Sequence, residues 1–128
     1  MIGYTMVGTT NLQRATRFYD ALLAPLGLAQ VEANETYTAY APTTAPDAVE
    51  FYVTKPFDAA RATAGNGSML AFLVPTRGLL ELFHKAGLAN GGGDEGSPGS
   101  RPSDATVHYA YIRDPDGNKI CAYCEHPD

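Results

Sequence analysis

Two side chains, His108 and Glu50, have the chemistry of proton transfer. An imidazole titrates near neutral pH, so His108 is the natural candidate for moving a proton. Glu50 stands among apolar residues, where desolvation would favour its protonated form and suit it to act as a general base. The alternatives are that His108 is a structural, hydrogen-bonded residue and that Glu50 faces water, without a role in catalysis. Strand alternation puts His108 on one face with Ala110 and Ile112, and it leaves open which face borders a cavity.

Two cysteines, Cys121 and Cys124, form a Cys-x-x-Cys pair. A reactive pair normally begins a helix, where the helix dipole stabilises the thiolate. This pair falls in an expected strand, three residues apart and therefore on opposite faces. A zinc site would need a second pair of ligands, which the sequence does not supply. We therefore expect two ordinary half-buried cysteines.

The elements that must position these side chains occur twice, 65 residues apart, with residues 18–21 matching residues 83–86. Each copy is expected to hold a strand, a helix that ends near a glycine, and three further strands. In the first copy the strands are expected at 2–8, 28–32, 37–41 and 49–54, with a helix from Leu12 towards Gly27. In the second copy we expect strands at 69–74, 107–113 and 119–124, a weak segment after Gly93, and a helix around 79–86 before Gly91.

This order of elements predicts an α+β fold with a mostly antiparallel sheet in each half. The chain is expected to form one domain, 1–128, with module one at about 1–55, a linker at about 56–67 and module two at about 68–124. A loop at 89–103, rich in Gly, Ser and Pro, is expected to be the most mobile segment, as a lid or as a solvated connection. His84 and His126 are expected at the surface.

Composition excludes several classes of function. The chain is 45% hydrophobic, with a formal net charge of −5. Its nine Lys and Arg residues are scattered, so we expect no nucleic-acid surface. No apolar run approaches the roughly 18 residues that span a bilayer, and the N-terminus lacks a basic region followed by an apolar one. We expect a cytoplasmic protein that does not enter the membrane.

The turn Arg113-Asp-Pro-Asp-Gly-Asn-Lys-Ile120 and the segment 12–28 together resemble the vicinal oxygen chelate superfamily. This superfamily includes glyoxalase I, bleomycin-resistance proteins, fosfomycin-resistance enzymes and extradiol dioxygenases. The resemblance covers essentially the whole chain. It implies two βαβββ modules that form a shared curled sheet around a cavity, with the helices outside and the turn marking the cavity. It also implies a homodimer.

The resemblance further implies positions for a divalent metal, and unsuitable residues occupy three of them. The two family histidines fall at Tyr4 and Met69, and the family glutamate falls at Cys121. The internal repeat independently pairs Tyr4 with Met69. A fourth ligand position falls at Tyr52 or Glu50. Phenol, thioether and thiol are a poor set for Mg²⁺, Mn²⁺ or Ni²⁺, so no metal cofactor is expected, and a Cu(I) site at Met69 and Cys121 is the remaining metal alternative.

Two functions remain open. The first is a metal-independent, glyoxalase/bleomycin-resistance-like protein that binds an apolar or aromatic small molecule. Its expected ligand-binding residues are Tyr4, Tyr52, Met69, Cys121 and Tyr123. The second is an enzyme, a lyase, isomerase or dioxygenase of the superfamily, similar to lactoylglutathione lyase. It would be metal-free with His108 or Glu50 as proton acceptor, or would use a non-standard metal site.

Overall fold

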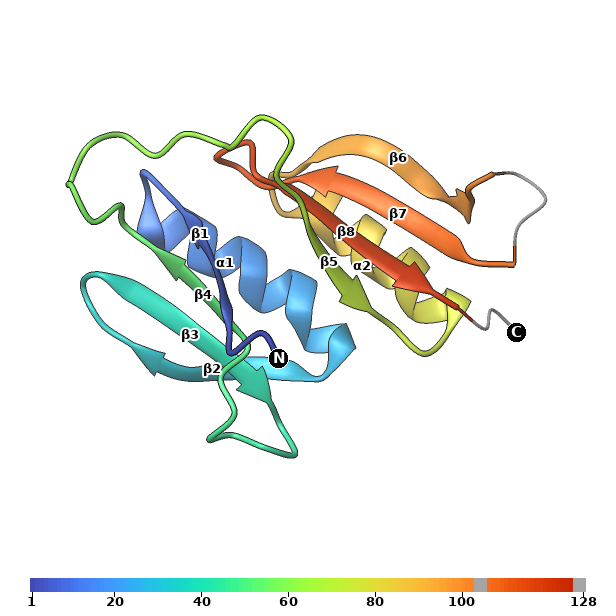
Figure 1. Ribbon diagram of the computed structural model, residues 1–128, viewed down its shortest axis with the longest axis horizontal. Helices are drawn as coiled ribbons and strands as arrows, with labels where there is room; N and C mark the ends of the chain where they lie inside the picture. Colours follow the sequence, from blue (N-terminus) through green and yellow to red (C-terminus); the bar gives the residue numbers. More distant parts are fainter. Residues whose placement is uncertain (103–105, 126–128) are drawn as a thin grey trace.

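A computed structural model of the protein describes residues 1–102 and 106–125. The expected order of strand, helix and three strands is confirmed in both halves (Figure 1). The first half contains β1 (Thr5–Gly8), α1 (Leu12–Leu23), the short 3-10 helix η1 (Ala24–Leu26), β2 (Leu28–Ala33), β3 (Tyr37–Pro42) and β4 (Phe51–Thr54). The second half contains β5 (Leu70–Leu73), α2 (Arg77–Ala89), β6 (Gly93–Ser100), β7 (His108–Arg113) and β8 (Lys119–Cys124).

The eight strands form two four-stranded sheets with the same topology. Their strand orders are β1-β4-β3-β2 and β5-β8-β7-β6. The pairs β1–β4 and β5–β8 are parallel, and the other neighbours are antiparallel. The α+β prediction is therefore confirmed. In place of one shared curled sheet, two open sheets lie side by side, and they do not close into a barrel.

Local signals explain where the helices begin and end. The side chains of Asn11 and Thr76 cap α1 and α2 by accepting hydrogen bonds from backbone N–H groups three residues later. After α2, Gly91 adopts a φ of 98°, and the N–H of Gly92 donates to the carbonyl of Gly87 at 2.9 Å. This is a Schellman motif, which needs a residue that tolerates the left-handed conformation. The prediction that Gly91 terminates the helix region is confirmed.

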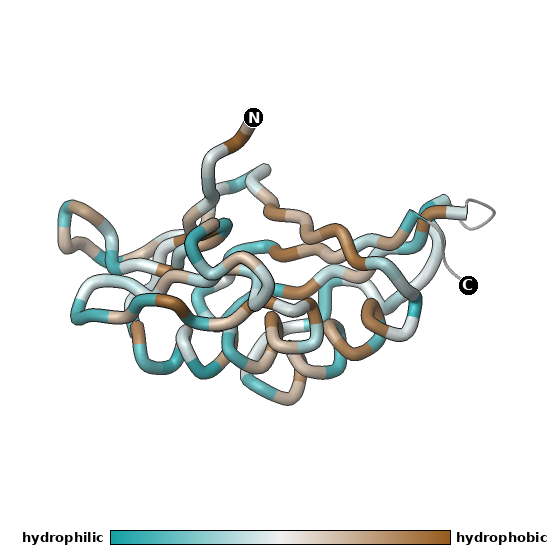
Figure 2. Tube along the Cα trace, turned by 90° about the horizontal axis from the view of Figure 1, so that it is seen from below, coloured by the Kyte–Doolittle hydropathy of each residue, from teal (hydrophilic) through white to brown (hydrophobic). Residues whose placement is uncertain are grey.

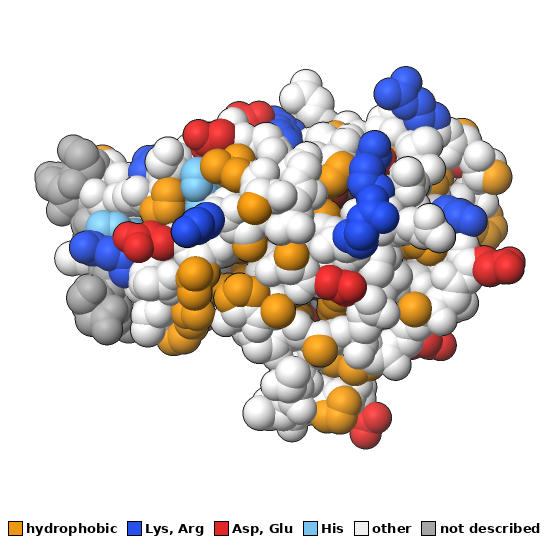
Figure 3. Space-filling model, turned by 180° about the vertical axis from the view of Figure 1, so that it is seen from behind, with side chains coloured by type: hydrophobic (Ala, Val, Ile, Leu, Met, Phe, Trp, Pro, Cys, Tyr) orange, Lys and Arg blue, Asp and Glu red, His pale blue; other side chains and the backbone are white. Residues whose placement is uncertain are grey.

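Both helices lie on the same side of the two sheets (Figure 2). The buried stripe of α1 includes Ala15, Phe18 and Leu22, which packs against residues of both sheets in one core. The rings of Phe51 in β4 and Phe72 in β5 lie 5.8 Å apart, so this core continues across the two halves. Figure 3 shows the helix-bearing side, where positive and negative side chains are interspersed. In the described part of the chain, no helix has the length and apolar character that crossing a membrane requires.

The opposite side of the sheets is called the helix-free face below. In each strand, residues that alternate with those buried in the core point to this face, and residues paired in register with them do the same. On the first sheet the helix-free face includes Tyr4, Met6, Tyr37 and Tyr52, and on the second sheet it includes Ala71, Leu73, Tyr109, Tyr111, Lys119, Cys121 and Tyr123.

The weak strand segment expected after Gly93 is confirmed as β6, but two other expectations about the second half are wrong. Most of the segment expected as a mobile loop is the eight-residue strand β6, which pairs with β7 through two register shifts. Gly and Ser have low strand propensity, so the residue types of β6 do not indicate a strand. The strand is held by its backbone pairing with β7. His84 is 8% exposed rather than at the surface, and its Nε2 lies 3.0 Å from Oδ1 of Asp94 in β6. That contact lowers the pKa of Asp94. Ser103 and His126 lie outside the described residues.

Candidate ligand-binding site

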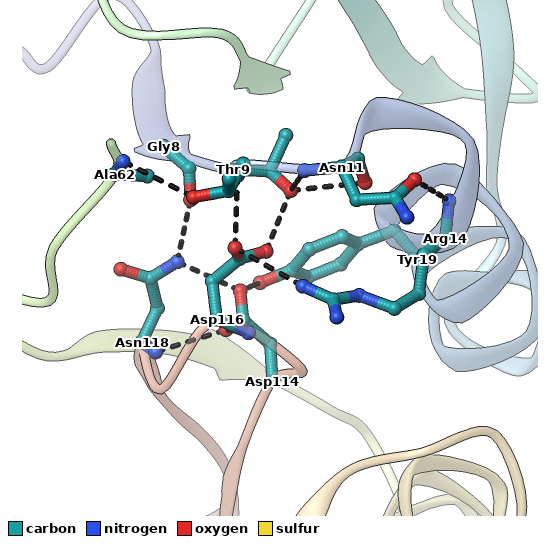
Figure 4. Close-up of polar contacts among 10 residues, drawn as sticks. Gly8, Thr9, Asn11, Arg14, Tyr19, Ala62, Asp114, Asp116 and Asn118 are labelled. Atoms are coloured by element: carbon teal, nitrogen blue, oxygen red, sulfur yellow. Dashed lines mark hydrogen bonds and ion pairs between the residues drawn. The ribbon is translucent and has the colours of Figure 1, made fainter. Parts of the chain in front are cut away.

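The Asp-Pro-Asp-Gly-Asn turn between β7 and β8 joins the second half of the molecule to the first (Figure 4). The buried carboxylate of Asp114 accepts a 2.6 Å hydrogen bond from the hydroxyl of Tyr19 in α1. It also accepts from the backbone N–H groups of Asp116 and Asn118 and from the side-chain amide of Asn118, at 2.8–2.9 Å. Burial, and next the charge of Asp114, raise the pKa of Tyr19 well above its ordinary value, so this hydroxyl stays a donor.

Asp116 and Asn118 complete this connection, which we call the module latch. The carboxylate of Asp116 accepts from the hydroxyl of Thr9 at 2.6 Å, the backbone of Thr10 at 2.9 Å and the guanidinium of Arg14 at 3.2 Å. The side-chain amide of Asn118 also donates to the carbonyl of Gly8 at 2.9 Å. These side chains therefore hold the two halves together, and Asn118 also borders a pocket between β1 and β5.

Three tyrosines gather on the helix-free face of the first sheet. The rings of Tyr4 and Tyr52 lie 4.9 Å apart, and those of Tyr37 and Tyr52 lie 5.4 Å apart, both in edge-to-face geometry. Tyr4 remains 57% exposed. The structure thus brings together Tyr4 and Tyr52, two of the residues expected to bind a ligand. Tyr37 was not among them, although alternation from Tyr52 across the paired strand β3 could have identified it.

A second group of tyrosines lies on the helix-free face of the second sheet. The ring of Tyr109 is nearly parallel to those of Tyr111 and Tyr123, with centroids 6.0 and 5.8 Å apart. We call these three residues the tyrosine row. Two cations lie over the ring of Tyr111, with Nζ of Lys119 at 5.3 Å and Cζ of Arg101 at 5.8 Å from its centroid. Of these five residues, the sequence had indicated Tyr123 alone as a ligand-binding residue.

A pocket of about 290 Å³ lies between β1 and β5 and is called the seam pocket. Its lining includes Met6, Met69, Ser68, Asn118 and Lys119. Of the five residues expected to bind a ligand, Met69 alone lines this pocket. Two larger hollows, of about 940 and 750 Å³, open around Lys55, and like the seam pocket they have no tyrosine in their linings. The seam pocket reaches both tyrosine groups through its neighbours, because Met6 pairs in register with Tyr52 and Lys119 lies over the ring of Tyr111.

Cys121 is buried within the helix-free face, where it pairs in register with Ala71 of β5 and Tyr111 of β7. Burial raises the pKa of its thiol to about 11, against a smaller opposing effect of the charges of Lys119 and Arg101. The thiol is consequently protonated at neutral pH. Cys124 packs on the other side of β8, in the core, so the two cysteines point to opposite faces as alternation predicts.

The residues at the expected metal positions do not fit a divalent metal. Tyr4 offers a phenol, Met69 a thioether and Cys121 a protonated thiol, whereas Mg²⁺, Mn²⁺ and Ni²⁺ favour carboxylate, imidazole and water. Within residues 1–102 and 106–125, no three His, Cys, Asp or Glu side chains form a group that could hold a metal ion. The raised pKa of Cys121 also gives the Cu(I) alternative no support.

Of the two candidate proton acceptors, His108 lies away from the tyrosines, whereas Glu50 lies beside them, because its carbonyl accepts the backbone N–H of Thr5, which follows Tyr4. His108 shares a strand face with Ala110 and Ile112, which are buried against the helices, and its Nε2 lies 3.0 Å from Nη2 of Arg77 at the start of α2. It therefore points to the helix side of the sheet. Glu50 is exposed just before β4, so it lacks the desolvation that the general-base hypothesis requires.

Comparisons with known proteins identify relatives that have the same architecture. A family model described as the glyoxalase/bleomycin resistance protein/dioxygenase superfamily matches residues 1–122. A crystal structure of a glyoxalase/bleomycin resistance protein from Albidiferax ferrireducens T118 is 41% identical, with a TM-score of 0.85 over 97% of this chain and 98% of that one. No curated protein matches the chain.

More distant structures share the fold alone. A glyoxalase-related enzyme from Fulvimarina pelagi is 18% identical, with a TM-score of 0.72 over 97% of this chain and 87% of that one. The fosfomycin resistance protein FosX from Mesorhizobium loti is 12% identical, with a TM-score of 0.69 over 97% of this chain and 91% of that one.

Proposed function

Because this chain belongs to the glyoxalase/bleomycin resistance protein/dioxygenase superfamily, we propose that it captures an apolar or aromatic small molecule on its helix-free face, without a divalent metal. The observation that carries this proposal is the presence of tyrosine groups on both sheets beside the seam pocket. An aromatic ring with a polar tip supplies apolar contact area and a hydrogen bond at its edge, which is the composition of many small-molecule sites.

The dimensions of the site support a small ligand. The seam pocket, at about 290 Å³, is close to the lower end of the range typical of ligand pockets. Met6 and Met69 on its walls are 51% and 48% exposed, and methionine side chains adapt to ligands of irregular shape. Ser68 and Asn118 add polar groups at its edge. A compound with one or two rings therefore suits the pocket and the adjoining tyrosines.

A homodimer is part of the proposal. Leu73 on the helix-free face is 61% exposed, in addition to Tyr4, Met6 and Met69, so this face leaves much apolar surface open to water. A second copy laid over it would bury that surface and turn an open face into an enclosed cavity. The ligand would then be surrounded by residues of both chains.

The enzyme alternative receives less support. A lyase or dioxygenase needs a metal or a positioned proton acceptor, and of the candidate residues His108 points to the helix side while Glu50, beside Tyr4, is exposed to water. Chelator-sensitive formation of lactoylglutathione from methylglyoxal and glutathione would nevertheless favour the alternative over binding.

We expect the purified protein to hold no stoichiometric Mn, Ni, Zn or Fe, because Tyr4, Met69 and Cys121 are unsuitable ligands for these ions. Elemental analysis after extensive dialysis measures this directly. About one of these metals per chain, lost in the variant Cys121→Ala, would overturn the metal-independent proposal.

A neutral two-ring compound such as 2-naphthol should raise the melting temperature in proportion to the logarithm of its concentration above Kd, as binding to the folded state requires. Met69→Arg should abolish the rise, because the longer charged side chain would fill the seam pocket and replace the apolar side chain on its wall. Leu82→Arg is the matched control, since Leu82 is exposed to a similar extent, 50%, but lies on α2. Equal responses of the two variants would contradict a site at the seam.

A further inference from the structure

The tyrosine row carries positive charge, although the chain as a whole has a formal net charge of −5. Lys119 and Arg101 both lie over the ring of Tyr111. A third cation on this part of the second sheet, Arg113, is neutralised by a 2.7 Å ion pair with Glu95. Lys119 differs from Arg113, because no described carboxylate forms an ion pair with it within 4.0 Å, although its charge also acts on Glu95 from farther away.

The position of Lys119 links the two parts of the proposed site. It is the first residue of β8, so the module latch immediately before it sets its place along the strand. Its side chain lines the seam pocket and also lies 5.3 Å from the Tyr111 ring. A ligand group in the pocket and a ligand ring on the tyrosine row would thus both be within reach of the same ammonium group.

Arg101 strengthens the positive charge of this surface from the other side of Tyr111. Its guanidinium donates to the carbonyls of Ser97 at 2.7 Å and Ser100 at 3.3 Å, which hold the side chain in place over the ring. The charges of both cations act on the thiol of Cys121 beneath them, where they favour the negative form. A negative group brought to this surface by a ligand would be favoured in the same way.

We propose that the ligand is a planar aromatic anion, with its rings against the tyrosine row and its carboxylate or phenolate at Lys119. This inference rests on the proposed function and narrows it to a class of compound. The aromatic part follows from three neighbouring half-buried tyrosine rings, and the anionic part follows from a lysine that forms no ion pair within 4.0 Å with a described carboxylate. An inorganic anion would leave the rings unused.

Isothermal titration calorimetry with 2-naphthoate and its neutral analogue 2-naphthamide tests the inference. The wild type should bind 2-naphthoate about tenfold more tightly than 2-naphthamide, since a charge-assisted hydrogen bond is stronger than a neutral one. Lys119→Gln should remove this preference by weakening the binding of 2-naphthoate alone. Lys119→Arg should retain the preference, and so should the control Lys85→Gln, an exposed lysine on α2.

The outcomes separate this inference from the proposed function. Equal affinity of the wild type for the two probes would overturn the anionic ligand and leave aromatic capture standing. A loss of affinity for both probes in Lys119→Gln would show that Lys119 acts by packing, and would also overturn the inference. If neither probe nor 2-naphthol binds the wild type, the proposed function fails as well.

Discussion

Asp114→Ala should lower the free energy of unfolding by on the order of 3 kcal/mol or more, which is a large share of the stability of a domain of this size. The buried carboxylate of Asp114 accepts four hydrogen bonds, and its loss leaves the hydroxyl of buried Tyr19 without its acceptor. Backbone donors of the turn lose their partner at the same time. Urea denaturation followed by circular dichroism gives the difference.

Two further variants show how much of the loss of stability in Asp114→Ala comes from the hydrogen bonds of the buried carboxylate. Tyr19→Phe removes one hydrogen bond of the module latch and keeps the ring in the core, so it should cost only about 1–2 kcal/mol. Asp47→Ala removes a carboxylate from an exposed position and should change the stability by less than about 0.5 kcal/mol. If Asp114→Ala were no more harmful than Asp47→Ala, the turn would not connect the two halves in solution as it does in the structure.

Phe51→Ala should cost about 3–5 kcal/mol, as is usual for truncating a fully buried aromatic side chain. The ring of Phe51 lies 4.8 Å from that of Tyr19 and 5.8 Å from that of Phe72, so it fills the core where the two halves meet. The cavity left behind would remove contacts on both sides of this junction. Chemical denaturation measures the loss.

Tyr52→Ala is the matched comparison, because Tyr52 follows Phe51 in β4 and points to the helix-free face. It should cost only about 1 kcal/mol, the value of its ring contacts with Tyr4 and Tyr37. The proposed function predicts that it weakens the binding of 2-naphthol instead. Similar losses of stability in Phe51→Ala and Tyr52→Ala would contradict the assignment of the two faces.

Local patterns in the sequence predicted most of the elements for clear physical reasons. The turn before Lys119 and the run of residues after it predicted β8 with the bounds that the structure has. Glycines at positions 27 and 91 marked helix ends because both adopt positive φ. The strand β6 was predicted only as a weak segment after Gly93, since Gly, Ser and Pro have low strand propensity. The strand forms through its pairing with β7.

The sequence by itself determined the repeated α+β order, the opposite orientations of Cys121 and Cys124, and the phenol, thioether and thiol groups at Tyr4, Met69 and Cys121. Each of these depends on residue type or on spacing within one element.

Only the tertiary structure decided which face of each strand packs against the helices and which face is left without helices. Alternation grouped His108 with Ala110 and Ile112, but the packing of α2 placed all three on the helix side. The contact of Asp114 with Tyr19 joins residues 95 positions apart, and the position of Lys119 over Tyr111 depends on the pairing of β7 with β8. Such contacts arise when separate elements pack together, so no local pattern of residues encodes them.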